Sequence, residues 1–387
     1  MYECMIESLE IKDFGPIKHI HVEDIKPMTV LIGESGSGKS TIMKVLALSR
    51  WLYKMMSIRS YLKYSGVKKT PFRFRIDSLL RTVGLEDYMR TSSIITYKNG
   101  EVVIRLENGN LNGTSQYIPK SQLSLEKISF IADNRNLVAD IIEGKISVKK
   151  QFYLNETYED YVKASESIRD FGVNYLGVKL EVRKTQQGLK HRIVSTENGN
   201  TFDIKLSDAS SGMKNIMPLN LIVEYYSKKF DIVGSMNQAI FSYVTKADSL
   251  KDFKAVENVG ELSHKRVHLF IEEPELSLFP ESQLHLVDFI TDRVISNGPE
   301  DYDISLMIAT HSPYIVNYLN VLLSRKTNGD YLNGKPCVDE KQLDVYRVFE
   351  GEIQSLMTLT KDGKTRVDAT DMVETMEAIG NEYAELN

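Results

Sequence analysis

The sequence predicts an α/β fold that carries a phosphate-binding loop between a buried strand and a helix. An apolar run at 28–32 has the composition of a buried strand. It leads into Gly33-Glu34-Ser35-Gly36-Ser37-Gly38-Lys39-Ser40, which matches the pattern G-x-x-x-x-G-K-[ST]. Apolar residues at helical spacing follow from Thr41 to about Tyr53. Strand, loop and helix therefore occur in the order that a phosphate-binding loop requires.

Length and composition limit the class of protein. With 387 residues, the chain has room for one large domain with an insertion, or for two domains. A formal net charge of −5 excludes a polycation that coats DNA without specificity. The two cysteines, Cys4 and Cys337, cannot make a disulfide framework and indicate a reducing compartment. The chain shows neither a signal-peptide segment nor an apolar run of about 20 residues, so we expect a cytoplasmic protein with no membrane partner.

The remaining elements follow from alternation, helical periodicity and turn residues. The clearest is a hairpin in which 94–97 and 102–106 flank the turn dipeptide Asn99-Gly100. Further strands are expected at 6–11, 17–22, 128–131, 176–183, 191–195, 267–271 and 304–309, and helices at 156–171, 213–230, 313–323 and 367–387. The last of these helices contains six acidic residues and no Lys or Arg.

The loop from Gly33 to Ser40 has the chemistry of a site for ATP. Its glycines let the backbone wrap around phosphate, and the helix that follows adds a partial positive charge at its N-terminus. Lys39 is expected to reach the β- and γ-phosphates and to act in catalysis, and the Ser40 hydroxyl is expected to ligate Mg²⁺. The residues expected to bind the nucleotide in this segment are Gly33, Ser35, Gly36, Gly38, Lys39, Ser40 and Thr41.

A second motif supplies two carboxylates. The apolar strand 267–271 is followed by Glu272 and Glu273. Carboxylates at the end of a strand beside a phosphate loop lie where Mg²⁺ and the attacking water need them. We expect Glu272 to assist the metal and Glu273 to act as the general base. Taken alone, the same pair of residues is also typical of a solvated turn.

The order of motifs resembles that of soluble ATP-binding-cassette (ABC) ATPases of the SMC/RecF-like type. Residues 272–280 resemble the Walker B and D-loop region of that family, and 309–313 resemble its switch-histidine segment. Residues 206–214 resemble its signature motif. The resemblance covers about 5–50 and 125–320 and implies a mixed β-sheet core flanked by helices.

The resemblance also implies roles for individual residues. His311 would contact the γ-phosphate and take part in catalysis. Ser211 and Gly212 would bind the γ-phosphate of ATP held by another subunit, so the active form would be a homo-oligomer, at least a dimer. This role agrees with their position at the start of the helix expected at 213–230, because a helix N-terminus favours an anion.

The sequence departs from the family pattern at several positions. Glu272 replaces the usual Asp of Walker B, and Ser35 replaces an Asn common in soluble relatives. Met213 and Lys214 replace Gly and Gln of the signature. No Q-loop glutamine follows the strand 128–131; the segment 131–135, which ends in Arg135, instead resembles ATPases of bacterial defence operons. These changes leave the rate of hydrolysis open and favour slow, switch-like turnover.

The expected domains are an ATPase core at 1–50 and 125–325, an insertion at 51–124 with the hairpin, and a C-terminal strand and acidic helix at 326–387. The segment 50–75 has eight Lys or Arg, no Asp or Glu, and interleaved aromatic residues. That composition suits nucleic acid, and it suits an acidic or DNA-mimicking phage protein equally well. It also fits two amphipathic helices with aromatic residues in the core and solvated lysines.

Three functions are compatible with these motifs. The first is a sensor ATPase of a bacterial anti-phage system, and here the chain resembles the ATPases of the PARIS systems, then those of the Septu systems. That resemblance implies a scaffold for a separately encoded effector, a TOPRIM-type nuclease. The second function is a RecF/SMC-like DNA-repair ATPase that clamps DNA. The third, the motor subunit of a membrane transporter, is disfavoured because the signature is altered and the Q-loop glutamine is missing.

Overall fold

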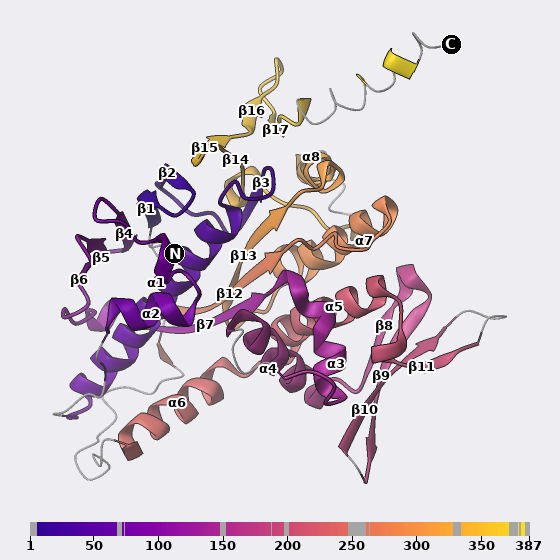
Figure 1. Cartoon of the computed structure of the whole chain (residues 1–387), viewed down its shortest axis with the longest axis horizontal. Helices are drawn as coiled ribbons and strands as arrows, with labels where there is room; N and C mark the ends of the chain where they lie inside the picture. Colours follow the sequence, from indigo (N-terminus) through magenta and orange to yellow (C-terminus); the bar gives the residue numbers. More distant parts are fainter. Residues whose placement is uncertain are drawn as a thin grey trace.

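A mixed six-stranded sheet forms the centre of the molecule in the computed structural model (Figure 1). The structure describes residues 6–67, 72, 74–147, 152–186, 188–196, 201–246, 261–262, 264–327, 334–370, 378 and 381–383. The strand order is β15-β14-β3-β13-β12-β7, in which only β15 is antiparallel to its neighbour. The bounds are β3 Met28–Ile32, β7 Ser124–Ile131, β12 His264–Glu272, β13 Asp303–Thr310, β14 Leu343–Phe349 and β15 Glu352–Ser355.

The strands expected at 28–32, 128–131, 267–271 and 304–309 are all confirmed as members of this sheet. Every residue of β3 is buried, as are the last six residues of β12. Strands of a parallel sheet that is covered on both faces read as continuous apolar runs, which explains why the sequence pattern located them.

A second, antiparallel sheet has the order β2-β1-β4-β5-β6. Its strands are β1 Glu7–Phe14, β2 Ile17–Val22, β4 Ile94–Asn99, β5 Val102–Glu107 and β6 Asn110–Asn112. The predicted hairpin is confirmed, although Asn99 ends β4 and the turn is formed by Gly100 and Glu101. Because β4 pairs with β1, the hairpin expected within an insertion belongs to the same sheet as the first two strands.

Helix α1 (Lys39–Tyr64) is longer than the helix expected from Thr41 to Tyr53. Neither Gly nor Pro interrupts these residues, and the helix ends only before Ser65-Gly66, where Gly66 has a positive φ of 88°. Most of the helix is buried on all sides, including Arg50 and Arg59, so its sequence lacks the one-sided apolar pattern of a surface helix. The domain boundary expected at residue 50 therefore lies inside a continuous helix.

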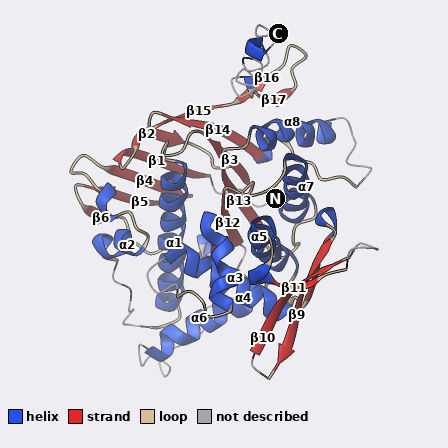
Figure 2. Ribbon diagram, turned by 45° about the vertical axis from the view of Figure 1, so that its right-hand side comes forward, coloured by secondary structure: helices blue, strands red, loops and turns tan. Residues whose placement is uncertain are grey.

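The other helices pack around the two sheets (Figure 2). Helices expected at 213–230 and 313–323 are confirmed as α5 and α8. The helix expected at 156–171 is shifted to α4, because residues 170–173 form a strand. The bounds are α2 Ile76–Thr82, α3 Val138–Ile142, α4 Phe152–Ser167, α5 Ser211–Lys228, α6 Ile232–Lys246, α7 Pro280–Thr291 and α8 Pro313–Thr327.

Shorter turns link these helices to the sheets. The 3₁₀ turns are η1 Glu86–Tyr88, η2 Lys120–Gln122, η3 Asp133–Leu137, η4 Asn174–Leu176, η5 Leu206–Asp208 and η9 Glu340–Gln342, and a π-helical turn, η7 Asp292–Ser296, extends α7. Among the residues described, no helix combines the length and hydropathy needed to span a membrane.

A four-stranded antiparallel sheet projects from the side of the molecule near α5 and α7 (Figure 2). Its order is β11-β10-β9-β8, with β8 Asp170–Val173, β9 Val178–Thr185, β10 Gly188–Ser195 and β11 Asp203–Lys205. Near the C-terminus, β16 Met357–Leu359 pairs with β17 Thr365–Val367. The acidic helix expected at 367–387 lies largely outside the described residues, which beyond 370 are only 378 and 381–383.

Candidate nucleotide-binding site

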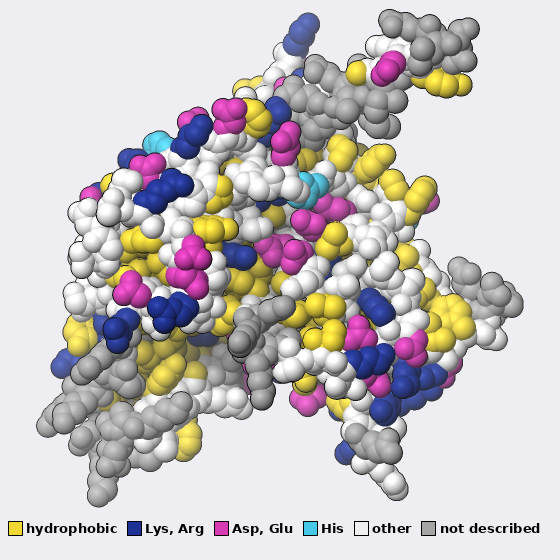
Figure 3. Space-filling view, in the orientation of Figure 1, with side chains coloured by type: hydrophobic (Ala, Val, Ile, Leu, Met, Phe, Trp, Pro, Cys, Tyr) yellow, Lys and Arg dark blue, Asp and Glu magenta, His cyan; other side chains and the backbone are white. Residues whose placement is uncertain are grey.

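A cavity of about 190 Å³ lies where the carboxyl ends of β3, β12 and β13 meet. This edge of a parallel sheet is where open α/β folds bind their ligands. Figure 3 shows acidic side chains and a histidine gathered in the middle of this face of the molecule. The residues that line the cavity are Pro16, Ser35, Gly36, Gly38, Lys39, Ser40, Thr41, Tyr88, Glu272, Glu273, Ala309 and His311.

The glycines of the loop are required for different structural reasons. Gly36 and Gly38 have positive φ angles of 79° and 111°, which residues with a Cβ rarely adopt. Gly33 lies beneath the loop rather than on the cavity wall, and a Cβ there would stand 2.2 Å from the carbonyl oxygen of Val348 in β14. Gly33 therefore permits a close approach between the loop and the sheet.

Lys39 is buried, and its Nζ lies inside the curve of the loop. It donates hydrogen bonds to the carbonyl oxygens of Gly33, at 2.8 Å, and Glu34, at 2.9 Å. Burial lowers the pKa of Lys39, and the charges of Glu273 and Glu275 oppose that change. Phosphate oxygens are stronger partners for an ammonium than neutral carbonyls, so the side chain is placed to exchange one set for the other.

Glu272 and Ser40 form the part of the site that fits a divalent cation. The Ser40 hydroxyl lies beside the carboxylate of Glu272, a residue that is 6% exposed and also interacts with the backbone of Asp133. Burial raises the pKa of Glu272, because its negative charge has few compensating groups; Ser40 and Lys44 act in the opposite direction. A buried carboxylate beside a hydroxyl provides the oxygen ligands that Mg²⁺ prefers.

Glu273 has an unusual backbone conformation, with a positive φ of 43°. Such strain in a non-glycine residue persists only where neighbouring groups hold it. Here the Glu273 N–H donates to the Ala309 carbonyl at 2.7 Å, and the Glu273 carbonyl accepts a hydrogen bond from Arg135 at 2.8 Å. The carboxylate Oε1 lies 3.5 Å from Nε2 of His311, and both side chains remain about one third exposed.

Three further residues lie in or beside this site, and the sequence patterns predicted no role for them. Glu275 accepts a hydrogen bond from the backbone N–H of His311 at 2.6 Å, which ties the end of β13 to the segment after β12. Tyr88 lines the cavity from η1, with its ring 6.0 Å from Phe14 in an edge-on contact. Arg135 lies beneath the two glutamates and is completely buried. The spacing Glu-Pro-Glu is a local signal for Glu275, whereas Tyr88 reaches the cavity only through the tertiary fold.

Ser211 and Gly212 do not line this cavity. They occupy the first positions of α5, after Ser210, whose side chain accepts a hydrogen bond from the N–H of Met213 at 3.4 Å. Ser211 is exposed, and a Cβ on Gly212 would stand 2.8 Å from the carbonyl oxygen of Ser277. The start of α5 therefore packs against the segment after β12 through Gly212, while Ser211 remains exposed to solvent.

Most described residues of the basic, aromatic segment 50–75 are part of the core. Arg50 is buried and pairs with Glu7 at 2.7 Å, and the buried Arg59 lies over the rings of Phe74 and Tyr117. Tyr53 and Tyr61 are buried, while Trp51, Tyr64, Phe72 and Phe74 pack against the core. Residues 68–71 and 73 lie outside the described part of the chain. Of the three interpretations, core aromatic residues fit best, although the two arginines are paired inside rather than solvated.

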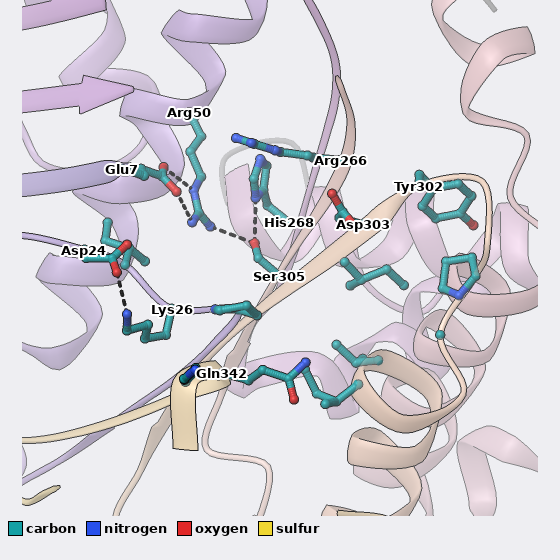
Figure 4. Close-up of a pocket in the computed structure, with 18 of the residues that line it drawn as sticks. Glu7, Asp24, Lys26, Arg50, Arg266, His268, Tyr302, Asp303, Ser305 and Gln342 are labelled. Carbon is teal, nitrogen blue, oxygen red and sulfur yellow. Dashed lines mark hydrogen bonds and ion pairs between the residues drawn. The ribbon is translucent and has the colours of Figure 1, made fainter. Parts of the chain in front are cut away.

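A larger cavity, of about 650 Å³, lies at the opposite edge of the central sheet, where β12 and β13 begin (Figure 4). In Figure 4, Arg50 lies between Glu7 and Ser305, and its Nη1 donates to the Ser305 hydroxyl at 3.2 Å. The ring of His268 bridges Ser305, at 2.6 Å, and Glu126, at 2.5 Å. This network joins α1 to four strands, β1, β7, β12 and β13, and it includes no residue of the phosphate loop.

The fold and the site define a P-loop ATPase, in which a glycine-rich loop, a buried acidic strand end and a histidine surround one cavity. A family model described as the AAA ATPase domain matches residues 52–316, more than half of the chain. The chain therefore belongs to the AAA ATPase domain family. The matched region begins after the phosphate loop and includes Arg135, Glu272, Glu273 and His311.

Similar solved structures include an SMC head bound to the C-terminal winged-helix domain of ScpA, with 12% identity over 91% of this chain and 97% of that chain and a TM-score of 0.34. The SMC head domain from Thermotoga maritima has 13% identity over 92% of this chain and 100% of that chain, with a TM-score of 0.37. A dimeric bacterial ABC transporter cassette has 10% identity over 89% and 96%, with a TM-score of 0.32. No curated protein matches the chain in sequence.

Proposed function

We propose that this ATPase is the sensor and scaffold subunit of an anti-phage defence system, which controls a separately encoded effector through ATP-gated oligomerisation. The observation that carries the proposal is the divided site. Lys39, Glu273 and His311 face one cavity, whereas the exposed Ser211 and the half-buried Gly212 lie outside it at the start of α5. A site completed by a second subunit links nucleotide state to assembly.

Within one subunit, the residues of the cavity divide the work of hydrolysis. Lys39 and the loop N–H groups bind the β- and γ-phosphates, and His311 contacts the γ-phosphate. Ser40 and Glu272 would hold Mg²⁺, which neutralises phosphate charge when it is bound. Glu273 accepts a proton from water as the water oxygen bonds to the γ-phosphorus and the bond to the ADP oxygen breaks.

Across the subunit boundary, the open N-terminus of α5 supplies the missing contacts. The N–H groups of Ser211 and Gly212 and the dipole of an 18-residue helix favour the γ-phosphate of a partner subunit. Hydrolysis would release this contact. The altered signature, with Met213 and Lys214, supports slow turnover, which suits a switch better than a motor.

The effector is proposed to be a TOPRIM-type nuclease, from the resemblance to the PARIS ATPases. The alternative is a RecF/SMC-like ATPase that clamps DNA through the segment 50–75. The pairing of Arg50 with Glu7, and the burial of Arg59 among aromatic rings, favour defence over that alternative, because these cations do not reach the surface.

The test uses the full chain together with the product of the neighbouring gene. We expect the two proteins to co-purify, and cells that carry both to resist phage infection only when Lys39 is intact. Lys63→Ala, at the exposed far end of the same helix, is the matched control and should keep protection. Salt-sensitive DNA binding without a protein partner, together with unchanged phage sensitivity, would support the repair alternative instead.

A further inference from the structure

Arg135 joins three separate segments of the ATPase through backbone carbonyls. It belongs to η3, directly after β7, and its side chain is 0% exposed. Its Nε donates to the carbonyl of Asn215 at 3.1 Å, and Nη1 donates to Ala132 at 3.1 Å and to Glu272 at 2.8 Å. Its Nη2 donates to the carbonyl of Glu273 at 2.8 Å.

None of these four hydrogen bonds ends on a carboxylate, which is the usual partner of a buried guanidinium. Burial lowers the pKa of Arg135, and the charges of Glu275, Asp133 and the two Walker B glutamates oppose that change. A planar fork with fixed donors holds carbonyls in defined directions, which a flexible lysine cannot do. Arg135 therefore serves to fix the directions of these backbone carbonyls more than to pair with a negative charge.

At one end, Arg135 holds the backbone that aims the general base. It donates to the carbonyls of the two peptide groups that flank the Cα of Glu273, where φ is 43°. The Ala309 carbonyl holds that N–H from the other side. If the guanidinium is lost, the strained turn can relax, and the Glu273 carboxylate moves away from His311.

At the other end, Arg135 contacts the signature helix. Asn215 lies in the first turns of α5, four residues after Ser211. A backbone carbonyl of this helix and the backbone of the general base thus share one rigid side chain. Any displacement of α5 changes the hydrogen bond to Nε and, through the planar fork, the two bonds to the glutamate carbonyls.

We propose that Arg135 is a positioning residue that couples the signature helix of a subunit to its own general base, Glu273. When Ser211 and Gly212 bind the nucleotide of a partner subunit, α5 is fixed, and Arg135 holds Glu273 in the orientation for proton transfer. The two sites of a dimer would then hydrolyse ATP in a coupled manner rather than independently. This inference rests on the proposed function, in which the signature acts across a subunit boundary.

The test measures ATPase rate against protein concentration for the wild type and for Arg135→Met and Arg135→Lys. The wild-type rate per subunit should rise with concentration as subunits associate. Arg135→Met should keep its KM for ATP within about threefold and lose at least ~100-fold in kcat, the lower range for a misplaced general base. Arg135→Lys keeps the positive charge but lacks the planar guanidinium, so its kcat should exceed that of Arg135→Met by less than about tenfold.

Arg59→Met is the matched control, because Arg59 is another buried arginine that donates to a carbonyl, that of Gln116, away from the cavity. It should keep the wild-type kcat. An equal loss in Arg59→Met, or a normal kcat in Arg135→Met, would overturn the coupling role. If Arg135→Met does not fold, Arg135→Lys alone decides, since full kcat without the fork contradicts the proposal. A wild-type rate independent of concentration would instead count against ATP-gated assembly.

Discussion

Nε2 of His311 lies 3.5 Å from Oε1 of Glu273, although the two residues come from the ends of different strands. β12 and β13 are adjacent and in register, with Glu272 opposite Ala309, so both side chains leave the sheet at one place. Glu275 fixes the backbone of His311 through a further hydrogen bond. The positions of the proposed base, Glu273, and of the proposed γ-phosphate contact, His311, therefore depend on each other. A substitution at either residue should alter the orientation of the other side chain.

Lys39→Ala should abolish ATP binding. The substitution removes the one ammonium inside the loop and leaves the carbonyls of Gly33 and Glu34 facing the phosphates. We expect the Kd for ATP, measured by calorimetry, to rise at least ~100-fold, since two charge-assisted contacts are lost. Lys63→Ala should bind ATP normally, and an unchanged Kd for Lys39→Ala would exclude its role in the loop.

Glu273→Gln should separate ATP binding from hydrolysis. The amide has nearly the same shape as the carboxylate but cannot accept a proton, so kcat should fall at least ~100-fold. The Kd for ATP should stay the same, and ATP-bound oligomers should accumulate in mass measurements. Glu281→Gln, an exposed change in the first turn of α7, serves as the control. Normal turnover by Glu273→Gln would remove this residue from the role of base.

Glu272→Gln should weaken the response to Mg²⁺ more than it weakens nucleotide binding. The substitution keeps a polar group beside Ser40 but removes the buried charge that a cation would neutralise. The Mg²⁺ concentration for half-maximal ATPase rate should rise about tenfold or more. Glu272→Asp, which restores the charge with one methylene less, should recover much of the response; equal Mg²⁺ curves for all three proteins would contradict a metal role.

The signature should act on the ATP of another subunit. In Gly212→Asp, the added side chain meets the Ser277 carbonyl and places a negative charge where the γ-phosphate would bind. This variant keeps its P-loop, whereas Lys39→Ala keeps its signature. We expect neither variant to form ATP-bound dimers alone and a mixture of the two to form them with ATP, as mass measurements would show, because one complete site can form between unlike subunits. A mixture of two folded variants that stays monomeric with ATP would argue for a site within one chain.

The buried pair of Glu7 and Arg50 should make stability depend on acid pH. Burial raises the pKa of Glu7, but the charge and hydrogen bonds of Arg50, with the charge of His268 and the hydrogen bond of Tyr97, together outweigh burial, so the pKa falls from 4.5 to about 2. The resulting stabilisation is fully present above pH 4.5 and is lost as the pH falls towards 2, because the unfolded state binds the proton first. Urea unfolding at several pH values measures this loss.

Arg50→Met should reverse that pH dependence and cost about 3–5 kcal/mol at neutral pH, because it leaves the Glu7 carboxylate buried without its partner and protonation then relieves the cost. Lys63→Met, on the exposed end of the same helix, should change stability little. A wild-type protein whose unfolding free energy stays constant between pH 5 and about 2 would show that this pair does not hold the fold.

The nucleotide loop, the two glutamates and the core strands could be predicted because their signals are local. A phosphate loop is one continuous segment, and its glycines, Lys39 and Ser40 must stand in a set order whatever surrounds them. Strands covered on both faces are apolar along their length, as β3 and β12 are. The hairpin β4–β5 likewise follows from alternation around a turn.

Other features depend on residues that meet only after folding. The pairing of β4 with β1 joins segments about 85 residues apart in the sequence. The hairpin that was expected within an insertion therefore belongs to the sheet formed by the first two strands. Tyr88 reaches the cavity from a short turn with no motif of its own. The segment 50–75 looked like a basic surface in the sequence, yet Arg50 and Arg59 are buried, because charge complementarity with Glu7 and aromatic rings is supplied by other elements.

Arg135 marks the limit of what residue patterns can convey. Its partners are backbone carbonyls, which every residue possesses, so no side-chain pattern records the four hydrogen bonds. The linear order of residues specified the nucleotide chemistry, since that chemistry needs particular side chains at short spacings. The link from the proposed signature helix, α5, to the proposed general base, Glu273, depends on the tertiary fold, since it needs only a buried guanidinium and three chain segments brought within hydrogen-bonding distance.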